Sequence, residues 1–258
     1  MKNIPEYSGT LRSHLLTVPK CISECSGIRI FGRRIKSLVF STDVAIIKNV
    51  NADAIIAVYP FTPQPSITQA IISVSEVPVF VGVGGGMTNG DRSVRLAEYS
   101  EHQGASGVVV NAPITDETIR KMKAVVDIPV ITTIVSGDMD IAARLEAGAD
   151  ILNVSGAAKT PDIVAKIRAQ FPDVPIIATG GPRDEDILRT IQAGANAITY
   201  TPPTTGQLFA DIMINHRRNF SKIGRLRKAP LPPLWHRGRE RKHEGKKVKL
   251  KKFFEKTR

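Results

Sequence analysis

A repeat of about fifty residues, the length of two strand–helix units, constrains this chain more than any other feature. In alternate units an apolar strand opens on a proline, and in the units between them a strand opens on Ala followed by Asp, Asn or Ser. The first kind comprises Val77-Pro78-Val79, Ile128-Pro129-Val130 and Val174-Pro175-Ile176, and the second comprises Ala52-Asp53, Ala105-Ser106, Ala149-Asp150 and Ala195-Asn196. A proline at a strand's first residue loses no ladder hydrogen bond, and a small residue followed by a polar one suits the turn that leaves a helix. The chain therefore predicts four copies of a double βα unit.

The repeat predicts eight strands, each followed by a helix. The strands are expected at 37–42, 53–59, 77–83, 106–111, 128–134, 149–154, 174–178 and 195–200, and the helices near 43–51, 64–75, 90–103, 115–125, 138–147, 160–170, 184–193 and 204–216. Eight alternations favour a (β/α)8 TIM barrel over residues 37–219, with an open parallel sheet as the alternative. Residues 1–36 form a short N-terminal preamble, and its segment from Gly27 to Gly32 is expected to be a short strand or hairpin arm that closes the barrel bottom.

The charge is concentrated at the C-terminal end. The net charge is +12, but 17 of the 36 basic residues and 3 of the 24 acidic ones lie from Arg217 to Arg258, so this segment carries +14 and the rest −2. Residues 220–258 are therefore predicted to be a basic, disordered tail that contains a proline-rich spacer. Its basic residues and interleaved aromatics could bind nucleic acid or an anionic surface. The alternatives are a solvated extension without a partner, or a segment that is not native to the barrel.

Several functional classes find no support in the sequence. No apolar run has the length of a membrane span, and no signal peptide is evident, so a soluble, cytoplasmic protein is expected. Cys21 and Cys25 have no second Cys or His pair at zinc spacing and are interpreted as reduced structural thiols.

The chemistry of a barrel enzyme sits where the strands end. No Lys or His stands at a predicted strand end, and the predicted ends hold no cluster of carboxylates. A Schiff base, a bound metal and a cofactor are therefore not expected.

Four polar residues at strand ends are the candidates for catalysis. Asp43 could act as general base or acid if the barrel mouth raises its pKa; alternatively it is the N-cap of the next helix. Asn111 and Asn153 could hold a substrate oxygen or brace neighbouring loops. Thr133 could have either of these two roles, and so could Ser155, which we place among the substrate-binding residues.

Two glycine-containing loops are candidates for binding an anion. Thr179-Gly180-Gly181 lies between a buried strand and a helix, where free helix N–H groups can bind a phosphate. The second loop runs from Gly84 to Ser93, where Gly85 and Gly86 allow a close approach of the backbone and Arg92 could meet a phosphate or carboxylate. It lacks G-x-G-x-x-G spacing, so we interpret it as a mobile lid, or else as a plain loop.

The segment Ile176-Ile177-Ala178-Thr179-Gly180-Gly181 and the run 193–196 resemble the ribulose-phosphate-binding group of TIM barrels and the 2-keto-3-deoxy-6-phosphogluconate aldolase-like barrels. The resemblance covers about residues 37–212 and implies a substrate phosphate held after the seventh and eighth strands. The first half of that site carries over to Gly180 and Gly181. In the second half Thr201 is followed by two prolines, which donate no N–H, and the aldolase lysine is missing. The chain also looks like uncharacterised bacterial barrel proteins labelled as hydrolases.

From these observations we expect a TIM-barrel enzyme that acts on a small, phosphorylated carbonyl or sugar metabolite. Acid/base chemistry of the lyase or isomerase type, without Schiff base or metal, is the first hypothesis. A hydrolase, or a non-catalytic metabolite-binding barrel with a nucleic-acid-binding tail, is the alternative. The sequence leaves the substrate and a homo-oligomeric state open.

Overall fold

The computed structural model describes residue 5, residues 16–214 and residue 217. Its first compact unit ends at Phe209. The predicted tail, 220–258, and the predicted barrel boundary at 219 lie outside the described residues, so both stay predictions.

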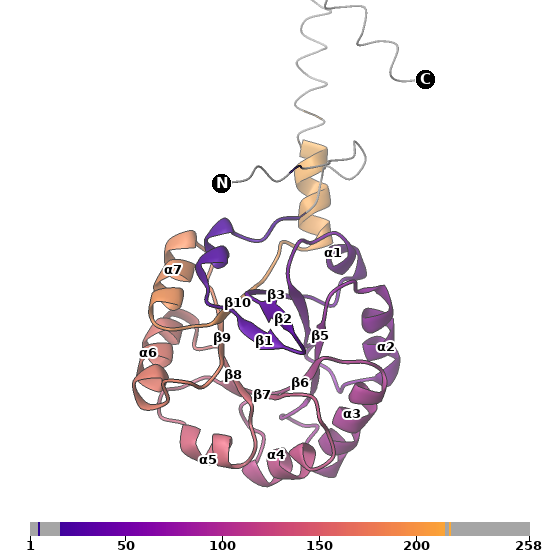
Figure 1. Cartoon of the computed structure of the whole chain (residues 1–258). Helices are drawn as coiled ribbons and strands as arrows, with labels where there is room; N and C mark the ends of the chain where they lie inside the picture. Colours follow the sequence, from indigo (N-terminus) through magenta and orange to yellow (C-terminus); the bar gives the residue numbers. More distant parts are fainter. Residues whose placement is uncertain (1–4, 6–15, 215–216, 218–258) are drawn as a thin grey trace, which may run out of the picture. The chain divides into compact units, whose positions relative to one another are not determined.

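Eight parallel strands close into a barrel in the order β10-β3-β4-β5-β6-β7-β8-β9 (Figure 1). The strands are β3 (Ser37–Phe40), β4 (Ala54–Ala57), β5 (Val79–Gly84), β6 (Gly107–Val110), β7 (Val130–Ile134), β8 (Ile151–Val154), β9 (Ile176–Thr179) and β10 (Ala197–Tyr200). The pairing of β10 with β3 closes the ring, so the TIM barrel is confirmed and the open sheet is excluded.

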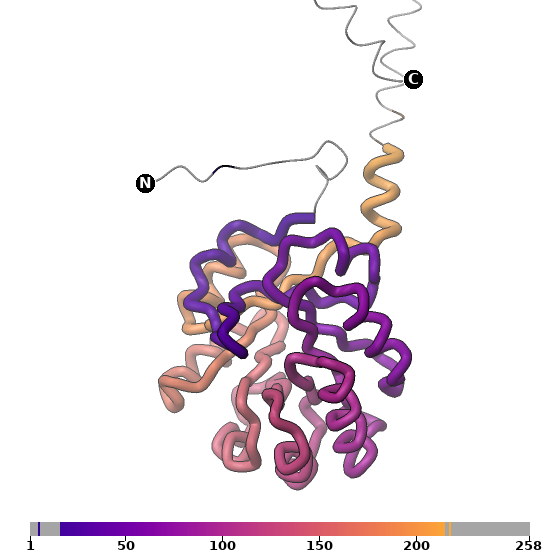
Figure 2. Tube along the Cα trace, turned by 45° about the vertical axis from the view of Figure 1, so that its right-hand side comes forward, coloured from indigo at the N-terminus to yellow at the C-terminus, as the bar shows by residue number. Residues whose placement is uncertain are grey.

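Helices alternate with the strands and surround them (Figures 1 and 2). They are α1 (Val44–Lys48), α2 (Pro65–Val74), α3 (Asp91–His102), α4 (Asp116–Lys123), α5 (Ile141–Glu146), α6 (Thr160–Gln170) and α7 (Asp184–Gln192), with short 3-10 helices η2 (Lys20–Glu24) and η3 (Ala157–Lys159). Residues 205–214 are also helical. No helix among the described residues is long and apolar enough to cross a membrane.

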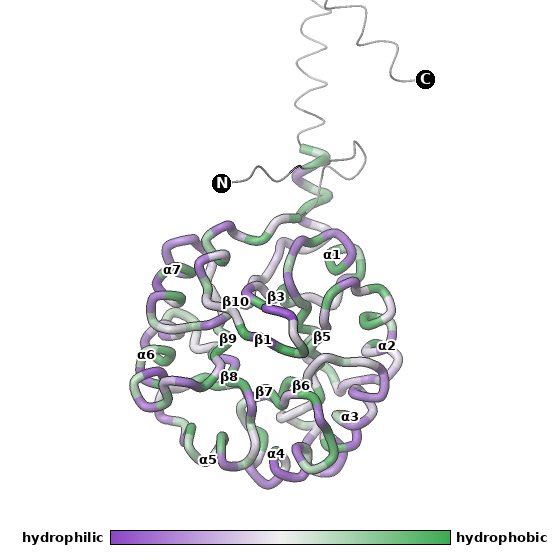
Figure 3. The backbone as a smooth tube through the Cα atoms, viewed as in Figure 1, coloured by the Kyte–Doolittle hydropathy of each residue, from purple (hydrophilic) through white to green (hydrophobic). Residues whose placement is uncertain are grey.

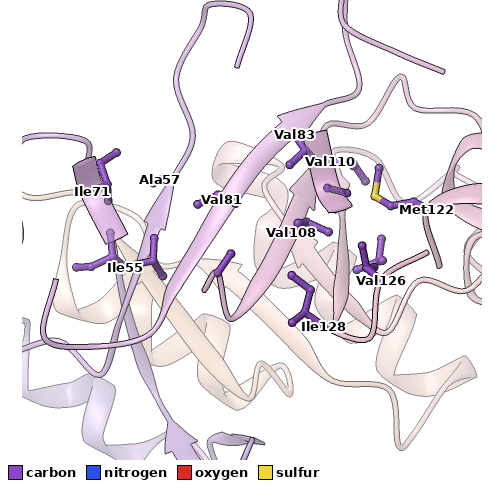
Figure 4. Close-up of a cluster of buried hydrophobic side chains, with 14 of the residues drawn as sticks. Ile55, Ala57, Ile71, Val81, Val83, Val108, Val110, Met122, Val126 and Ile128 are labelled. Atoms are coloured by element: carbon purple, nitrogen blue, oxygen red, sulfur yellow. The ribbon is translucent and has the colours of Figure 1, made fainter. Parts of the chain in front are cut away.

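The barrel has two apolar layers, which follow from the alternation of side chains along each strand. Outward-facing residues pack under the helices. Figure 4 shows part of this layer, in which Val110 of β6 lies beside Met122 of α4, and Val81 and Val83 of β5 and Val108 of β6 belong to the same buried cluster. Inward-facing residues fill the barrel, and hydrophobic segments gather inside the more polar helix surfaces (Figure 3).

An antiparallel hairpin of β1 (Ile28–Ile30) and β2 (Arg33–Ile35) packs against the barrel interior at the end where the barrel strands begin. Ile28, Ile30 and Ile35 belong to the same buried cluster as Leu38 and Ala54 at the start of the barrel strands. The segment predicted as a strand or hairpin arm is therefore the first half of a hairpin that packs against the barrel core.

The polar residues that open alternate strands bind the backbone of the neighbouring strand. Asp53 accepts hydrogen bonds from the N–H groups of Lys36 (2.9 Å) and Ser37 (3.0 Å), Asp150 accepts one from Val130 (2.8 Å), and Asn196 accepts one from Ile176 (2.9 Å). Three of the four repeats thus use an Asp or Asn to satisfy a backbone N–H where two strands begin. This explains the residue type of the repeat better than the turn alone.

The Asp150→Ala substitution should therefore destabilise the barrel. It leaves the N–H of fully buried Val130 without its carboxylate partner and removes an ion pair with Lys123 of 2.9 Å. We expect a loss of about 1–3 kcal/mol in the free energy of unfolding, measured by urea denaturation. Glu117→Ala, which removes only an exposed pair with Lys121, is the control and should change stability by less than about 0.5 kcal/mol. Equal effects of the two substitutions would contradict this role of Asp150.

Candidate functional site

Two adjoining cavities open at the carboxyl ends of the strands, on one side of the barrel mouth. The β3–β4 cavity, of about 560 Å³, is lined by Phe40, Ser41, Thr42, Asp43, Ile46, Val58, Tyr59, Pro60, Asn111, Thr201, Pro202, Pro203 and Thr204. The β4–β5 cavity, of about 170 Å³, is lined by Val58, Tyr59, Pro60, Phe61, Thr62, Pro63, Gly82, Gly84, Gly86, Met87, Thr88, Val109 and Asn111. Val58, Tyr59, Pro60 and Asn111 border both, so they form the wall between the two cavities.

Asp43 lies in the wall of the β3–β4 cavity and is the N-cap of α1. Its carboxylate accepts hydrogen bonds from the N–H groups of Ala45 (2.8 Å) and Ile46 (3.3 Å) and from the hydroxyl of Thr205. The hydrogen bond from Thr205 has the largest effect and holds the pKa of Asp43 below its ordinary value; partial burial opposes it, and the two backbone hydrogen bonds lower the pKa further. Asp43 is therefore an ionised carboxylate at neutral pH, and the raised pKa expected from a dry mouth is not found.

The glycine loop after β5 is shaped by its contact with the end of β6. Gly85 has φ +102°, and a Cβ there would lie 2.5 Å from the backbone nitrogen of Asn111. The N–H of Gly85 donates to the carbonyl of Thr88 (2.8 Å), and the N–H of Asn111 donates to that of Gly84 (2.9 Å). Gly86 has open space around it and borders the β4–β5 cavity. Gly85 is thus required by the conformation of the loop, whereas Gly86, like Gly84, borders the cavity.

The two glycines after β9, Gly180 and Gly181, are required by packing and by backbone conformation. A Cβ on Gly180 would lie 2.7 Å from Ile198 and 2.8 Å from Ile187, so this residue lets α7 pack on the barrel. The N–H of Gly180 already donates to the carbonyl of Thr199 (3.2 Å). Gly181 has φ +83°, which a residue with a side chain rarely adopts.

The helix N-terminus beside these glycines is acidic. Asp184, Glu185 and Asp186 occupy the first turn of α7, and Arg183 pairs with Asp186 (3.0 Å). Three carboxylates there compete with an anion for the positive end of the helix dipole. The geometry at Gly180 and Gly181 therefore gives a phosphate little support.

Four of the remaining predicted residues lie together, and the other two lie apart from them. Thr133, Asn153, Ser155 and Thr179 come together on the β7–β9 side of the mouth: the amide of Asn153 donates to Thr133 (3.3 Å), and Thr179 donates to Ser155 (3.2 Å). Thr201 borders the β3–β4 cavity, and exposed Arg92 stands in the first turn of α3.

Sequence reasoning placed Tyr59 at a strand end without giving it a role, and it missed two residues of the mouth, Phe40 and Thr199. Phe40 and Tyr59 line cavities, and Thr199 faces the interior one residue before the last strand ends. Alternation within a predicted strand could have placed Thr199 inside the barrel, but only once the register of the closed barrel is known.

Among the described residues, no group of three or more His, Cys, Asp and Glu side chains is arranged so that it could hold a metal ion. The eight barrel strands also end without a lysine. Asp43 is the only acidic side chain in the walls of the two cavities.

No family model matches this sequence, and no curated protein matches it. Solved structures do resemble the barrel. Phosphonopyruvate hydrolase in complex with oxalate and Mg²⁺ is 17% identical, with a TM-score of 0.53 over 78% of this chain and 88% of that one. The lyase acting on 2,3-dimethylmalate, a member of the PEP mutase/isocitrate lyase superfamily, is 14% identical, with a TM-score of 0.55 over 73% and 82%. The 4-hydroxy-tetrahydrodipicolinate synthase of Methylacidiphilum fumariolicum SolV is 14% identical, with a TM-score of 0.52 over 64% and 67%.

At these identities the similarity shows the fold alone. The chain is distantly similar in structure to the PEP mutase/isocitrate lyase and dihydrodipicolinate synthase types of TIM barrel. The sequence resemblance to the ribulose-phosphate-binding group stays a prediction.

Proposed function

We propose that this chain is an enzyme that acts on a small carbonyl or sugar metabolite by proton transfer, as a lyase or an isomerase does. The observation that carries the proposal is the β3–β4 cavity, whose wall holds the ionised carboxylate of Asp43 and the amide of Asn111 at the carboxyl ends of the strands. Active sites of TIM-barrel enzymes are built at this face. Asp43 takes a proton from the carbon next to a carbonyl, and the amide of Asn111 holds the carbonyl oxygen as negative charge develops on it.

In this proposal the anionic group of a phosphorylated substrate faces the glycine loop rather than Gly180 and Gly181. The loop borders the β4–β5 cavity through Gly84 and Gly86, and Arg92 follows it on α3. The acidic first turn of α7 disfavours the other location.

The enzyme classes among similar barrels are compatible with this proposal. They include a lyase named for 2,3-dimethylmalate and a hydrolase named for phosphonopyruvate. A hydrolase would use the same carboxylate to activate water, and it is the alternative within the class of enzymes.

Hydrogen–deuterium exchange tests the proposal without knowledge of the full reaction. Metabolites that raise the melting temperature are first selected from a panel of phosphorylated sugars, free sugars and keto acids. Each is then incubated with the protein in D2O, and NMR follows the loss of the C–H signal next to its carbonyl. The proposal predicts exchange that depends on the protein for at least one bound metabolite.

The second candidate function, a non-catalytic metabolite-binding barrel, is favoured by the bonding of Asp43. Its carboxylate already accepts three hydrogen bonds, and the lowered pKa makes it a weaker base. Binding with no exchange in any selected metabolite, and no other product detected by NMR, would decide for this candidate.

A further inference from the structure

Two layers of side chains inside the barrel, just beneath the mouth, are each divided into an apolar half and a polar half. The register places inward-facing residues in layers of four drawn from alternate strands. One layer consists of Phe40, Gly82, Thr133 and Thr179, and the layer beneath it of Ile56, Val109, Asn153 and Thr199. The members from β3 to β6 are all apolar, and the members from β7 to β10 are all hydroxyls or amides.

Two buried polar atoms in the polar half have no hydrogen-bond partner. These atoms are Oδ1 of Asn153 and Oγ1 of Thr199, and they belong to the same layer on β8 and β10. Thr199 is only 6% exposed. An unpaired buried polar atom costs about 1–3 kcal/mol, so a folded protein normally supplies it with a partner.

We propose that Asn153 and Thr199 bind a hydroxyl group of an uncharged part of the ligand, with the adjoining carbon atoms against Ile56 and Val109. A hydroxyl donates one hydrogen bond and accepts others, so it can donate to Oδ1 of Asn153 and accept from Oγ1 of Thr199. None of the eight residues in the two layers is charged, so nothing there offsets an ionised group.

The β4–β5 cavity reaches this depth from the apolar side. It is lined by Gly82, which contributes no side chain to the upper layer, and by Val109 of the lower layer. The ligand class is therefore an alcohol, a polyol or a hydroxy-carbonyl compound with an apolar flank. This inference rests on the proposed function only in placing the ligand in the barrel mouth.

The test uses 2-propanol and acetone as probes, because they match in shape but only 2-propanol donates a hydrogen bond. Each is titrated into the full chain, and NMR follows the methyl resonances of Ile56 and Val109. We expect 2-propanol to bind more tightly than acetone. The Thr199→Val substitution should weaken 2-propanol binding about five-fold, since one hydrogen bond is worth about 1 kcal/mol.

Thr132→Val is the matched control. Oγ1 of Thr132 is also buried without a partner, but Thr132 pairs in register with Val110 and Leu152 and faces the helices. Both valine variants should fold at least as stably as the unmodified protein, because each removes an unpaired hydroxyl. Thr132→Val should leave 2-propanol binding unchanged, and Thr199→Ser should retain it.

Equal affinities for the two probes, or equal effects of the two valine variants, would overturn the inference and leave water as the partner of these atoms. The outcome is separate from that of the exchange experiment, which depends on Asp43. Hydroxyl binding without exchange would refute proton transfer by Asp43 and keep this site, and exchange without selectivity for the hydroxyl would refute this site and keep the proton transfer.

Discussion

The Asp43→Asn variant is expected to lose hydrogen–deuterium exchange by about 10²–10⁴-fold, the usual contribution of a positioned general base. Asparagine is as good an N-cap as aspartate, so α1 should keep its capping bond, and the free energy of unfolding should change by less than about 1 kcal/mol. The measurement is the initial exchange rate in D2O, with ligand affinity followed in parallel.

Asp43→Ala separates the two roles of this residue. It removes the hydrogen bonds from the N–H groups of Ala45 and Ile46 as well as the charge, so the free energy of unfolding should fall by about 1 kcal/mol. The rate of exchange should fall by the same factor as in the Asn variant. An Asn variant with undiminished exchange would show that Asp43 only caps the helix.

The pH dependence follows from the lowered pKa of Asp43. The carboxylate stays ionised throughout the neutral range, so its contribution to exchange should be flat between about pH 5 and 8. A folded-state pKa below the unfolded value means that Asp43 stabilises the fold above about pH 4. That stabilisation is lost as the pH falls through the folded pKa.

The Gly85→Ala variant should lose about 3 kcal/mol or more of stability, a decrease of about 6–12 °C in the melting temperature. The residue has φ +102°, and a Cβ would lie 2.5 Å from the nitrogen and 2.7 Å from the oxygen of Asn111. Backbone atoms at that distance cannot move aside as a flexible side chain would. The measurement is thermal unfolding of the full chain.

Gly86→Ala is the matched control one residue along the same loop. No atom lies within 4 Å of a Cβ at Gly86, so the variant should be as stable as the unmodified protein. Its added methyl group would lie at the border of the β4–β5 cavity and should lower the affinity for ligands that occupy this cavity. Similar stability of the two variants would mean that the turn at Gly85 is not held as the structure shows.

The fold could be predicted because it depends on features that are local in the sequence. Apolar β-branched runs, the prolines that open strands and the glycines that end helices recur at one spacing, and the eight predicted strands overlap β3 to β10. The hairpin partner β2 was not predicted, because Arg33 and Arg34 do not alternate with apolar residues.

The site could be predicted only in outline. Strand ends located Asp43, Asn111 and Asn153 at the mouth, but what each contacts depends on neighbours far apart in the chain. The bond from Thr205 to Asp43 joins residues at opposite ends of the barrel sequence, and the packing of Gly180 against Ile198 requires the closed ring. Such contacts are set by register and helix packing, which a single sequence does not specify.

A crystal structure of the chain with a metabolite selected by its thermal shift tests the central claim most directly. Our account predicts the ligand in the mouth cavities, in contact with Asn111 and Asp43, with an uncharged hydroxyl between Asn153 and Thr199. A ligand bound at the N-terminus of α7 against Gly181, or at the opposite end of the barrel beside β1 and β2, would contradict it.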